Sequence, residues 1–237
     1  MDLGLDGKIA LVTASSKGLG RASALALSRE GAKVVICARG EEALRDAERQ
    51  MPGETLAIVA DVTEPETPQR LVDATVERFG GLDVLVANAG GPPPARALNV
   101  DDAAVEAAVN ANLLTSIRLV RAALLHLQHA AWGRICCIAS WGVKDPIPEL
   151  ALSNIARTGL LAWAKTAAKD LVSDGITLNL ALPGPHASDR MKELGGAGRM
   201  GDPEDFGKVV AFLCSRPAGF TSGAAIPVDG ATSAGLL

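Results

Sequence analysis

The sequence predicts an α/β fold in which a parallel sheet is doubly wound, with helices on both faces. Short apolar or β-branched runs alternate with longer amphipathic runs, which is the order of parallel strands joined by helical crossovers. The apolar runs are nearly continuous, as expected for strands covered on both faces. A chain of 237 residues, 48% of them hydrophobic, can bury a substantial core, so we expect a single domain spanning residues 1–237.

Seven runs are short and apolar enough to be strands, and six longer runs between them have helical spacing. The predicted strands are Ile9–Thr13, Val34–Ala38, Leu56–Val59, Val84–Ala87, Ile135–Ile138, Thr177–Leu182 and Ile226–Val228. The predicted helices lie near Leu19–Arg29, Glu41–Gln50, Pro65–Phe79, Asp101–Ala130, Leu152–Ser173 and Pro203–Leu213. Gly31, Gly80 and Gly175 stand where three of these helices should end. We interpret the Pro- and Gly-rich stretches Gly90–Pro94 and Pro183–Gly201 as loops beside a site.

Charge and composition narrow the classes of partner. The net charge is −4 and the pI is near 5.4, so we expect no nucleic-acid partner. The N-terminal MDLGLDGKIALV has no basic segment ahead of its apolar run and is not typical of a secretory signal. No apolar run reaches the ~18 residues that suggest a membrane span. We therefore expect a cytoplasmic protein with no membrane partner.

The four cysteines predict no metal site. Cys37, Cys136, Cys137 and Cys214 show no C-x-x-C spacing, and three of them stand in apolar runs. They are interpreted as small buried thiols in a reducing compartment, with a metal or redox role as the alternative.

A Gly-rich turn follows the first predicted strand. Ser15-Ser16-Lys17-Gly18-Leu19-Gly20 leads directly into a helix, so backbone amides and the positive helix end would face a ligand above the sheet. This arrangement suits the pyrophosphate of a dinucleotide, and a tight turn with no ligand is the alternative. The second strand ends at Arg39, where an arginine accommodates the 2′-phosphate of NADP(H). Together with Lys17, Arg39 favours NADP(H), with NAD(H) as the alternative cofactor.

Several motifs together resemble one known family. Thr13 to Gly20 (TASSKGLG), Asn88-Ala89-Gly90, Asn112, Ser140, Pro183-Gly184 and Val228-Asp229-Gly230 resemble the short-chain dehydrogenase/reductase family, especially its 3-oxoacyl-carrier-protein reductase-like members. The resemblance runs nearly end to end. It implies a Rossmann-type sheet and hydride transfer between a nicotinamide and a carbonyl or alcohol carbon.

The resemblance also implies which residues bind the cofactor. Ala14 replaces the first glycine of the family's turn, and Asp61 resembles the position that contacts adenine, with a capping carboxylate as the alternative. The implied cofactor-binding residues are Thr13, Ser15, Ser16, Lys17, Gly18, Leu19, Gly20, Arg39, Asp61, Val62, Asn88, Ala89, Gly90, Arg157, Pro183 and Gly184.

The family's acid–base motif is altered in this chain. The chain contains no tyrosine, and Ser153 and Arg157 stand where the resemblance implies Tyr-x-x-x-Lys. A phenol has a pKa of ~10, whereas an aliphatic hydroxyl should lie nearer that of water, ~15.7. The implied catalytic residues are Asn112, Ser140, Ser153 and Arg157, with Asn110 as the alternative to Asn112 and a capping role as the alternative for Ser140.

Two other residues could supply the proton. Lys144 follows Ser140 in the same loop, and His186 follows Pro183-Gly184; each could also be an ordinary loop residue.

Two classes of function remain open from the sequence. The first is an NADP(H)-dependent oxidoreductase acting on a small carbonyl or alcohol substrate, for example a 3-oxoacyl compound, through an atypical proton relay. The second is a non-catalytic NADP(H)-binding regulator or inactive subunit. We interpret residues 184–201 as the substrate-loop region, with Ala187 to Arg199 as a mobile lid.

The resemblance and two apolar segments favour a homotetramer, with a homodimer next. These segments are Gly223–Leu237 and Leu152–Ala168, and burial of the second segment inside the monomer is the alternative.

Overall fold

The computed structural model describes residues 1–130, 132–195 and 198–235. All seven strands form one parallel sheet in the order β3-β2-β1-β4-β5-β6-β7, which confirms the predicted fold class. The strands are β1 (Ile9–Val12), β2 (Lys33–Ala38), β3 (Thr55–Val59), β4 (Val84–Ala87), β5 (Arg134–Ile138), β6 (Thr177–Pro183) and β7 (Ala225–Val228). Their bounds agree with the sequence prediction to within one residue at each end.

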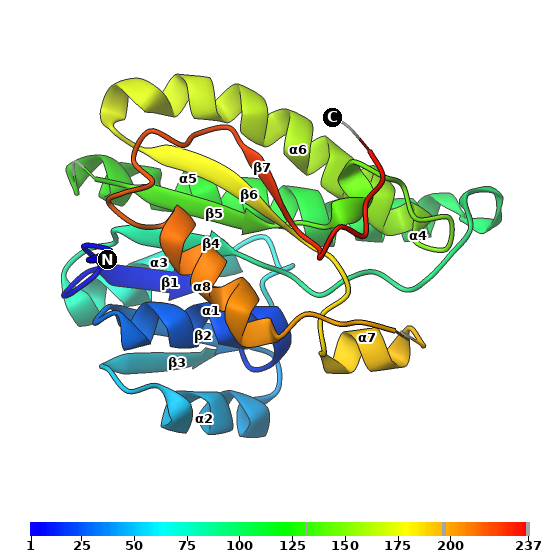
Figure 1. Cartoon of the computed structure of the whole chain (residues 1–237). Helices are drawn as coiled ribbons and strands as arrows, with labels where there is room; N and C mark the ends of the chain where they lie inside the picture. The colour runs from blue at the N-terminus through cyan, green and yellow to red at the C-terminus, as the bar shows by residue number, and fades with distance from the viewer. Residues whose placement is uncertain (131, 196–197, 236–237) are drawn as a thin grey trace.

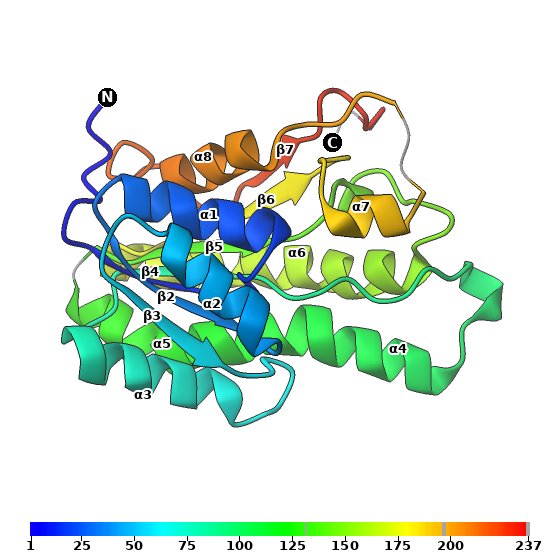
Figure 2. The ribbon, with the colours of Figure 1, turned by 90° about the horizontal axis from the view of Figure 1, so that it is seen from below.

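Helices cover both faces of this sheet (Figures 1 and 2). One face carries α1 (Gly18–Arg29), α2 (Glu41–Gln50) and α8 (Pro203–Leu213). The other carries α3 (Thr67–Phe79), α5 (Thr115–His129) and α6 (Ala151–Leu171), and α4 (Asp102–Val109) packs against α6. The central strands are buried on both faces, which explains why their sequences are continuously apolar rather than alternating.

The helix predicted over Asp101–Ala130 is interrupted. Residues Asn110–Leu114 form a single π-helical turn between α4 and α5. The backbone N–H and the hydroxyl of Thr115 both donate to the carbonyl oxygen of Asn110, five residues earlier, and so widen the helix at this point. Such turns often mark functional sites.

The stretch Asp102–His129 is long and apolar enough, by length and composition alone, to cross a membrane, contrary to the sequence expectation. One side of its α5 part packs on the sheet, where Leu119, Val120, Ala123 and Leu127 are buried. The core helix of a globular domain meets the same criteria of length and composition.

The order in which strands are added to the sheet changes direction between β1 and β4. These strands pair directly, whereas β2 and β3 lie on one side of β1 and β5 to β7 on the other side of β4. A crevice at the carboxyl ends of the strands is expected at this switch point. The segments after β1, β4, β5 and β6 begin there and contain most of the predicted site residues, whereas Arg39 follows β2 and Asp61 and Val62 follow β3.

Candidate active site

The turn after β1 is held between its two neighbouring strands. Ser15 is buried, and its backbone N–H donates to the Cys37 carbonyl of β2 over 2.9 Å, while its hydroxyl donates to Val12 over 2.7 Å. On the other side, the Thr13 hydroxyl donates to the carbonyl oxygen of Asn88 over 2.7 Å, and the Asn88 N–H donates back to that hydroxyl over 2.9 Å. The turn is therefore fixed between β2 and the end of β4.

Gly20 makes this packing possible. A Cβ at position 20 would lie 2.4 Å from the Ala14 carbonyl oxygen and 2.7 Å from Nδ2 of Asn88, distances that no side chain tolerates. The same Nδ2 donates to that oxygen over 3.1 Å. Ala14 itself has a φ of +47°, a left-handed conformation that costs a residue with a Cβ about 1–2 kcal/mol. Ala14 therefore adopts a backbone conformation that favours glycine.

The basic residues predicted to select NADP(H) are both exposed beside this turn. Lys17 is the N-cap residue of α1, and its side chain makes no capping hydrogen bond to the described residues. Arg39 at the end of β2 is 80% exposed, and its Nη1 lies 3.8 Å from Oδ2 of Asp61. Both guanidinium and ammonium groups are available to a ligand at the crevice.

Asp61 has the capping role that the sequence offered as the alternative to contact with adenine. Its Oδ1 accepts hydrogen bonds from the backbone N–H of Thr63 over 2.9 Å and from the Thr63 hydroxyl over 2.8 Å. Partial burial raises the pKa of Asp61, but the two Thr63 hydrogen bonds and the charge of Arg39 outweigh it, so the pKa lies below its usual value. Val62 beside it is buried in the core.

Ser140 lies two residues beyond the end of β5. Its Oγ accepts a 3.1 Å hydrogen bond from the N–H of Gly142 and caps a short 3₁₀ turn, Trp141–Val143. This is the capping role, yet a hydroxyl that accepts here still has its proton to donate. Gly142 in turn lies against the start of α6, where a Cβ would come within 2.8 Å of Oδ1 of Asn154.

Arg157 does not reach into open solvent. It is 7% exposed, and its Nη1 donates to the carbonyl oxygens of Ile138 over 2.7 Å and Ala139 over 3.1 Å, at the end of β5. Burial, and then the positive charge of Arg190, lower the pKa of Arg157 to about 10. Ser153, one helical turn earlier, is also buried. Ser153 and Arg157 thus share the face of α6 that meets the sheet.

Asn112 rather than Asn110 has an unused polar group. Asn110 is occupied, because its Nδ2 donates to Thr63 and its Oδ1 accepts from Arg118 over 2.6 Å. Asn112 is 2% exposed, and neither its Nδ2 nor its Oδ1 has a hydrogen-bond partner among the described residues. An amide buried in this way costs free energy unless a water or ligand pairs with it.

The substrate-loop region contains a short helix that the sequence analysis missed, α7 (Asp189–Glu193), capped by the Ser188 hydroxyl. Ser188 followed by an acidic first turn was the available signal. The Nη2 of Arg190 donates to the Pro92 carbonyl oxygen over 2.5 Å, so this helix is joined to the Gly90–Pro94 loop. Residues 196–197 of the predicted lid lie outside the described residues.

His186 lies at the base of that loop. It is 5% exposed, its Nδ1 is 3.0 Å from the Gly184 carbonyl oxygen, and its ring meets Phe206 edge-on at 5.3 Å. A Cβ on Gly201 would lie 2.9 Å from the ring, so both ends of the loop pack on this histidine. The structure therefore favours an anchoring role.

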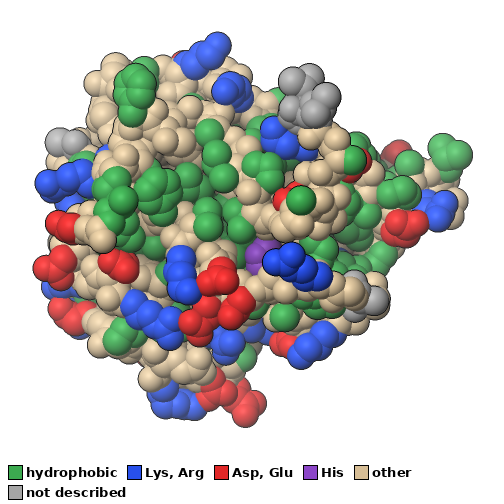
Figure 3. Space-filling view, viewed as in Figure 1, with side chains coloured by type: hydrophobic (Ala, Val, Ile, Leu, Met, Phe, Trp, Pro, Cys, Tyr) green, Lys and Arg blue, Asp and Glu red, His purple; other side chains and the backbone are tan. Residues whose placement is uncertain are grey.

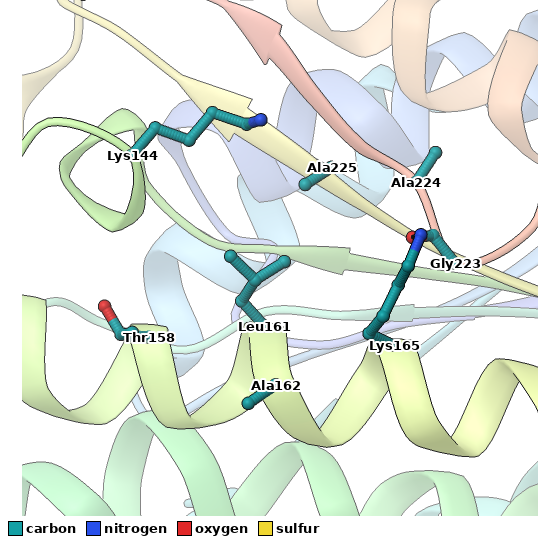
Figure 4. Close-up of a pocket in the computed structure, with 8 residues that line it drawn as sticks. All are labelled: Lys144, Thr158, Leu161, Ala162, Lys165, Gly223, Ala224 and Ala225. Atoms are coloured by element: carbon teal, nitrogen blue, oxygen red, sulfur yellow. Dashed lines mark hydrogen bonds between the residues drawn. The ribbon is translucent and has the colours of Figure 1, made fainter. Parts of the chain in front are cut away.

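Lys144 lines a hollow of about 440 Å³ between α6 and β7 (Figure 4). The other lining residues are Thr158, Leu161, Ala162, Lys165, Gly223, Ala224 and Ala225. Lys165 donates to the Gly223 carbonyl oxygen over 2.9 Å.

Comparison with known proteins gives consistent matches over the whole length. The family profile described as Enoyl-(Acyl carrier protein) reductase matches residues 13–233. The chain is 32% identical to Dehydrogenase/reductase SDR family member 4 of Sus scrofa, over 98% of this chain and 89% of that protein. It is also 32% identical to the 3-oxoacyl-acyl-carrier-protein reductase FabG of Haemophilus influenzae, over 95% of this chain and 98% of that protein.

A solved structure shows the same likeness. L-sorbose reductase from Gluconobacter frateurii, crystallised with NADPH and L-sorbose, superposes with a TM-score of 0.89 at 28% identity, over 97% of this chain and 98% of that chain.

Proposed function

Because the chain belongs to the short-chain dehydrogenase/reductase family of NAD(P)-dependent oxidoreductases, we propose that it reduces or oxidises a small carbonyl or alcohol substrate with NADP(H), through an altered proton relay. The observation that carries this proposal is the tight crossing at the switch point, where Gly20 passes beneath Ala14 and Asn88. The family's relatives include reductases of a sugar and of 3-oxoacyl compounds, and both classes belong in a substrate panel.

The residues at the crevice fit a dinucleotide. The first turn of α1 offers backbone N–H groups, Gly18 leaves room above it, Gly20 lets the turn pack tightly against Ala14 and Asn88, and basic groups lie at the rim. In this proposal Thr13 to Gly20 hold the pyrophosphate, Asp61 and Val62 border the adenine, and the main chain of Asn88 to Gly90 and of Pro183 and Gly184 lines the nicotinamide. When bound, the nicotinamide ring supplies or accepts the hydride.

Arg39 and Lys17 favour NADP(H) over NAD(H). Both are exposed at the rim, where a guanidinium and an ammonium can pair with a 2′-phosphate. We expect Arg39→Ala to raise the Kd for NADPH about tenfold and to leave the Kd for NADH within about twofold, consistent with the loss of one charge-assisted contact. Arg49→Ala, which removes an exposed arginine in the last turn of α2, is the matched control. Equal Kd values for the two cofactors in the unmodified protein would refute this selectivity.

The proton must come from a group other than a phenol. Ser140 has a hydroxyl proton to donate, Ser153 lies in the first turn of α6, and Arg157 places a fixed positive charge at the end of β5. In our proposal the Ser140 hydroxyl gives its proton to the substrate oxygen, Ser153 donates a second hydrogen bond to that oxygen, Arg157 holds the substrate in place, and a buried water ordered by Asn112 returns a proton to Ser140. Turnover through a relay of this kind is expected to be slower than turnover with a tyrosine as the acid, since a positioned acid typically raises the rate ~10²–10⁴-fold.

A direct test compares the unmodified protein with the Ser153→Tyr/Arg157→Lys double variant, measuring NADPH oxidation across a panel of ketones, sugars and 3-oxoacyl esters at equal cofactor saturation. Turnover by the unmodified protein that the double variant does not improve supports the altered relay. His186→Ala should raise KM through loss of the loop anchor while kcat changes less, and a lost kcat at unchanged KM would make His186 the proton donor instead.

A non-catalytic NADP(H)-binding protein is the second candidate. It is favoured by the absence of any tyrosine and by Arg157, whose Nη1 is committed to two carbonyl oxygens of the sheet. NADPH binding with turnover in the double variant alone would select this candidate.

The apolar face over β7 supports a homotetramer, or else a homodimer. Figure 3 shows apolar side chains gathered over β7 and the adjoining parts of α6 and α8. Phe212 of α8 is 42% exposed and Phe220 is fully exposed, and the hollow of Figure 4 opens on the same side. Residues 236–237 of the predicted interface tail lie outside the described residues. A monomeric mass by sedimentation equilibrium would exclude both assemblies.

A further inference from the structure

The positive charge of Arg157 has no acidic partner. The five residues outside the described ranges carry no acidic side chain, and among the described residues no carboxylate lies within 4.0 Å of this guanidinium. Only Nη1 of Arg157 is hydrogen-bonded to the described residues, through the carbonyl oxygens of Ile138 and Ala139 at the end of β5. Nε and Nη2 make no hydrogen bond to the described residues. A buried cation held in this way is costly unless a counter-ion joins it.

A second guanidinium, that of Arg190, lies beside the loop that follows β4, the strand that neighbours β5. The charged neighbour that perturbs Arg157 is Arg190, which is also positive. Arg190 extends from α7 across the crevice, where its guanidinium would lie 3.5 Å from a Cβ on Gly91 and where it is held by the Pro92 carbonyl oxygen. Its one acidic neighbour in the described chain is the exposed Glu193, at 3.8 Å, a distance typical of a weak surface pair.

The two arginines therefore form a cationic site between α6 and the loop helix α7. Like charges repel, and a protein that buries one of them and fixes the other by a hydrogen bond gains most from a ligand that neutralises both. A guanidinium binds a carboxylate through two parallel N–H donors, and Arg157 still has Nε and Nη2 free for this.

We propose that the substrate of this protein carries a carboxylate, so that it is a small oxo acid or hydroxy acid whose anion binds Arg157 and Arg190 together. This inference builds on the proposed oxidoreductase function and specifies its substrate class. In a closed loop the carboxylate joins α7 to α6, while the substrate carbonyl faces Ser140.

The test is calorimetric titration of the NADPH-saturated protein with 2-oxobutanoate and 4-oxopentanoate, each compared with its methyl ester. An ester keeps the shape of the acid and removes its charge. We expect at least one acid to bind ten times more tightly than its ester or better. Equal affinity of every acid and its ester would overturn the proposal.

Variants identify the groups that recognise the acid. Arg190→Gln should reduce the preference for acid over ester to within about threefold and leave ester binding unchanged. Lys192→Gln is the control, because Lys192 is an exposed cation of the same helix that faces Asp189 at 3.6 Å. If Arg190→Gln weakens NADPH binding and leaves the acid preference intact, Arg190 pairs with a cofactor phosphate and the proposal fails.

The same titrations separate this inference from the proposed function. Absence of NADPH binding would reject the function, and the acid preference is then measured on the cofactor-free protein. NADPH binding without any acid preference would reject the substrate class and leave the function standing.

Discussion

Replacing Gly20 with alanine should damage the switch point by an amount that the structure allows us to work out. The new methyl would lie 2.4 Å from the Ala14 carbonyl oxygen and 2.7 Å from Asn88 Nδ2. Neither can move freely, since the first is backbone and the second is hydrogen-bonded to it. Overpacking of this kind costs about 1–3 kcal/mol, and loss of the Asn88 bond adds about 1 kcal/mol.

A total of about 2–4 kcal/mol corresponds to a fall in Tm of roughly 4–16 °C for a chain of this length. We would measure Tm by calorimetry and the Kd for NADPH by fluorescence, and we expect cofactor binding to weaken at least tenfold. Gly40→Ala is the matched control, because a Cβ there meets nothing within 4 Å and its φ of −91° suits alanine. A Gly20→Ala protein with unchanged Tm would refute the reasoning.

Three further predictions follow from residues around the sheet. Ala14→Gly should stabilise the protein by about 0.5–1 kcal/mol, since relief of the left-handed φ exceeds the added chain entropy, and urea unfolding with no gain would contradict this. The pKa of Asp61 is lowered on folding, so the Asp61 carboxylate stabilises the folded protein fully above ~pH 5, and this contribution is lost as pH falls through the folded-state pKa. The difference in free energy of unfolding between the unmodified protein and Asp61→Asn should therefore shrink as the pH falls over that range. A difference that does not depend on pH would exclude this role. Arg134→Met should destabilise the protein by about 3 kcal/mol or more, because the buried Arg134 donates hydrogen bonds to three carbonyl oxygens and its guanidinium lies 4.4 Å from the centre of the Trp132 ring. A loss below about 1 kcal/mol in urea unfolding would show that these hydrogen bonds contribute little.

The sequence predicts the strands almost completely, for a simple reason. Each is a short apolar run between polar segments, and in the central strands burial on both faces makes the run continuously apolar. The π-helical turn at Asn110 could not be predicted, because it depends on which carbonyl Thr115 finds after α4 and α5 have packed. The local pattern there is that of one continuous helix.

The candidate site, like the fold, could be predicted from the sequence only in part. The Gly-rich turn and the residues after β4 and β6 are local motifs, and the structure brings them to one edge of the sheet. The hydrogen bond of Arg157 to Ile138 at the end of β5 and that of Arg190 to the Pro92 carbonyl join residues 19 and 98 positions apart, which no spacing rule reveals. The sequence predicts the types of residue in the site but not the main-chain carbonyls that hold its two arginines.

The position of α7 has a consequence for the timing of a catalytic cycle. The Cβ of Ser188, which caps α7, lies 3.9 Å from where a Cβ on Gly18 would be, and Arg190 ties the helix down on the far side. The loop therefore arches over the groove in which a dinucleotide would lie, and a small substrate could still enter from the side. We expect a compulsory order, with the nucleotide first to arrive and last to leave, and release of the nucleotide paced by the breaking of one arginine–carbonyl bond.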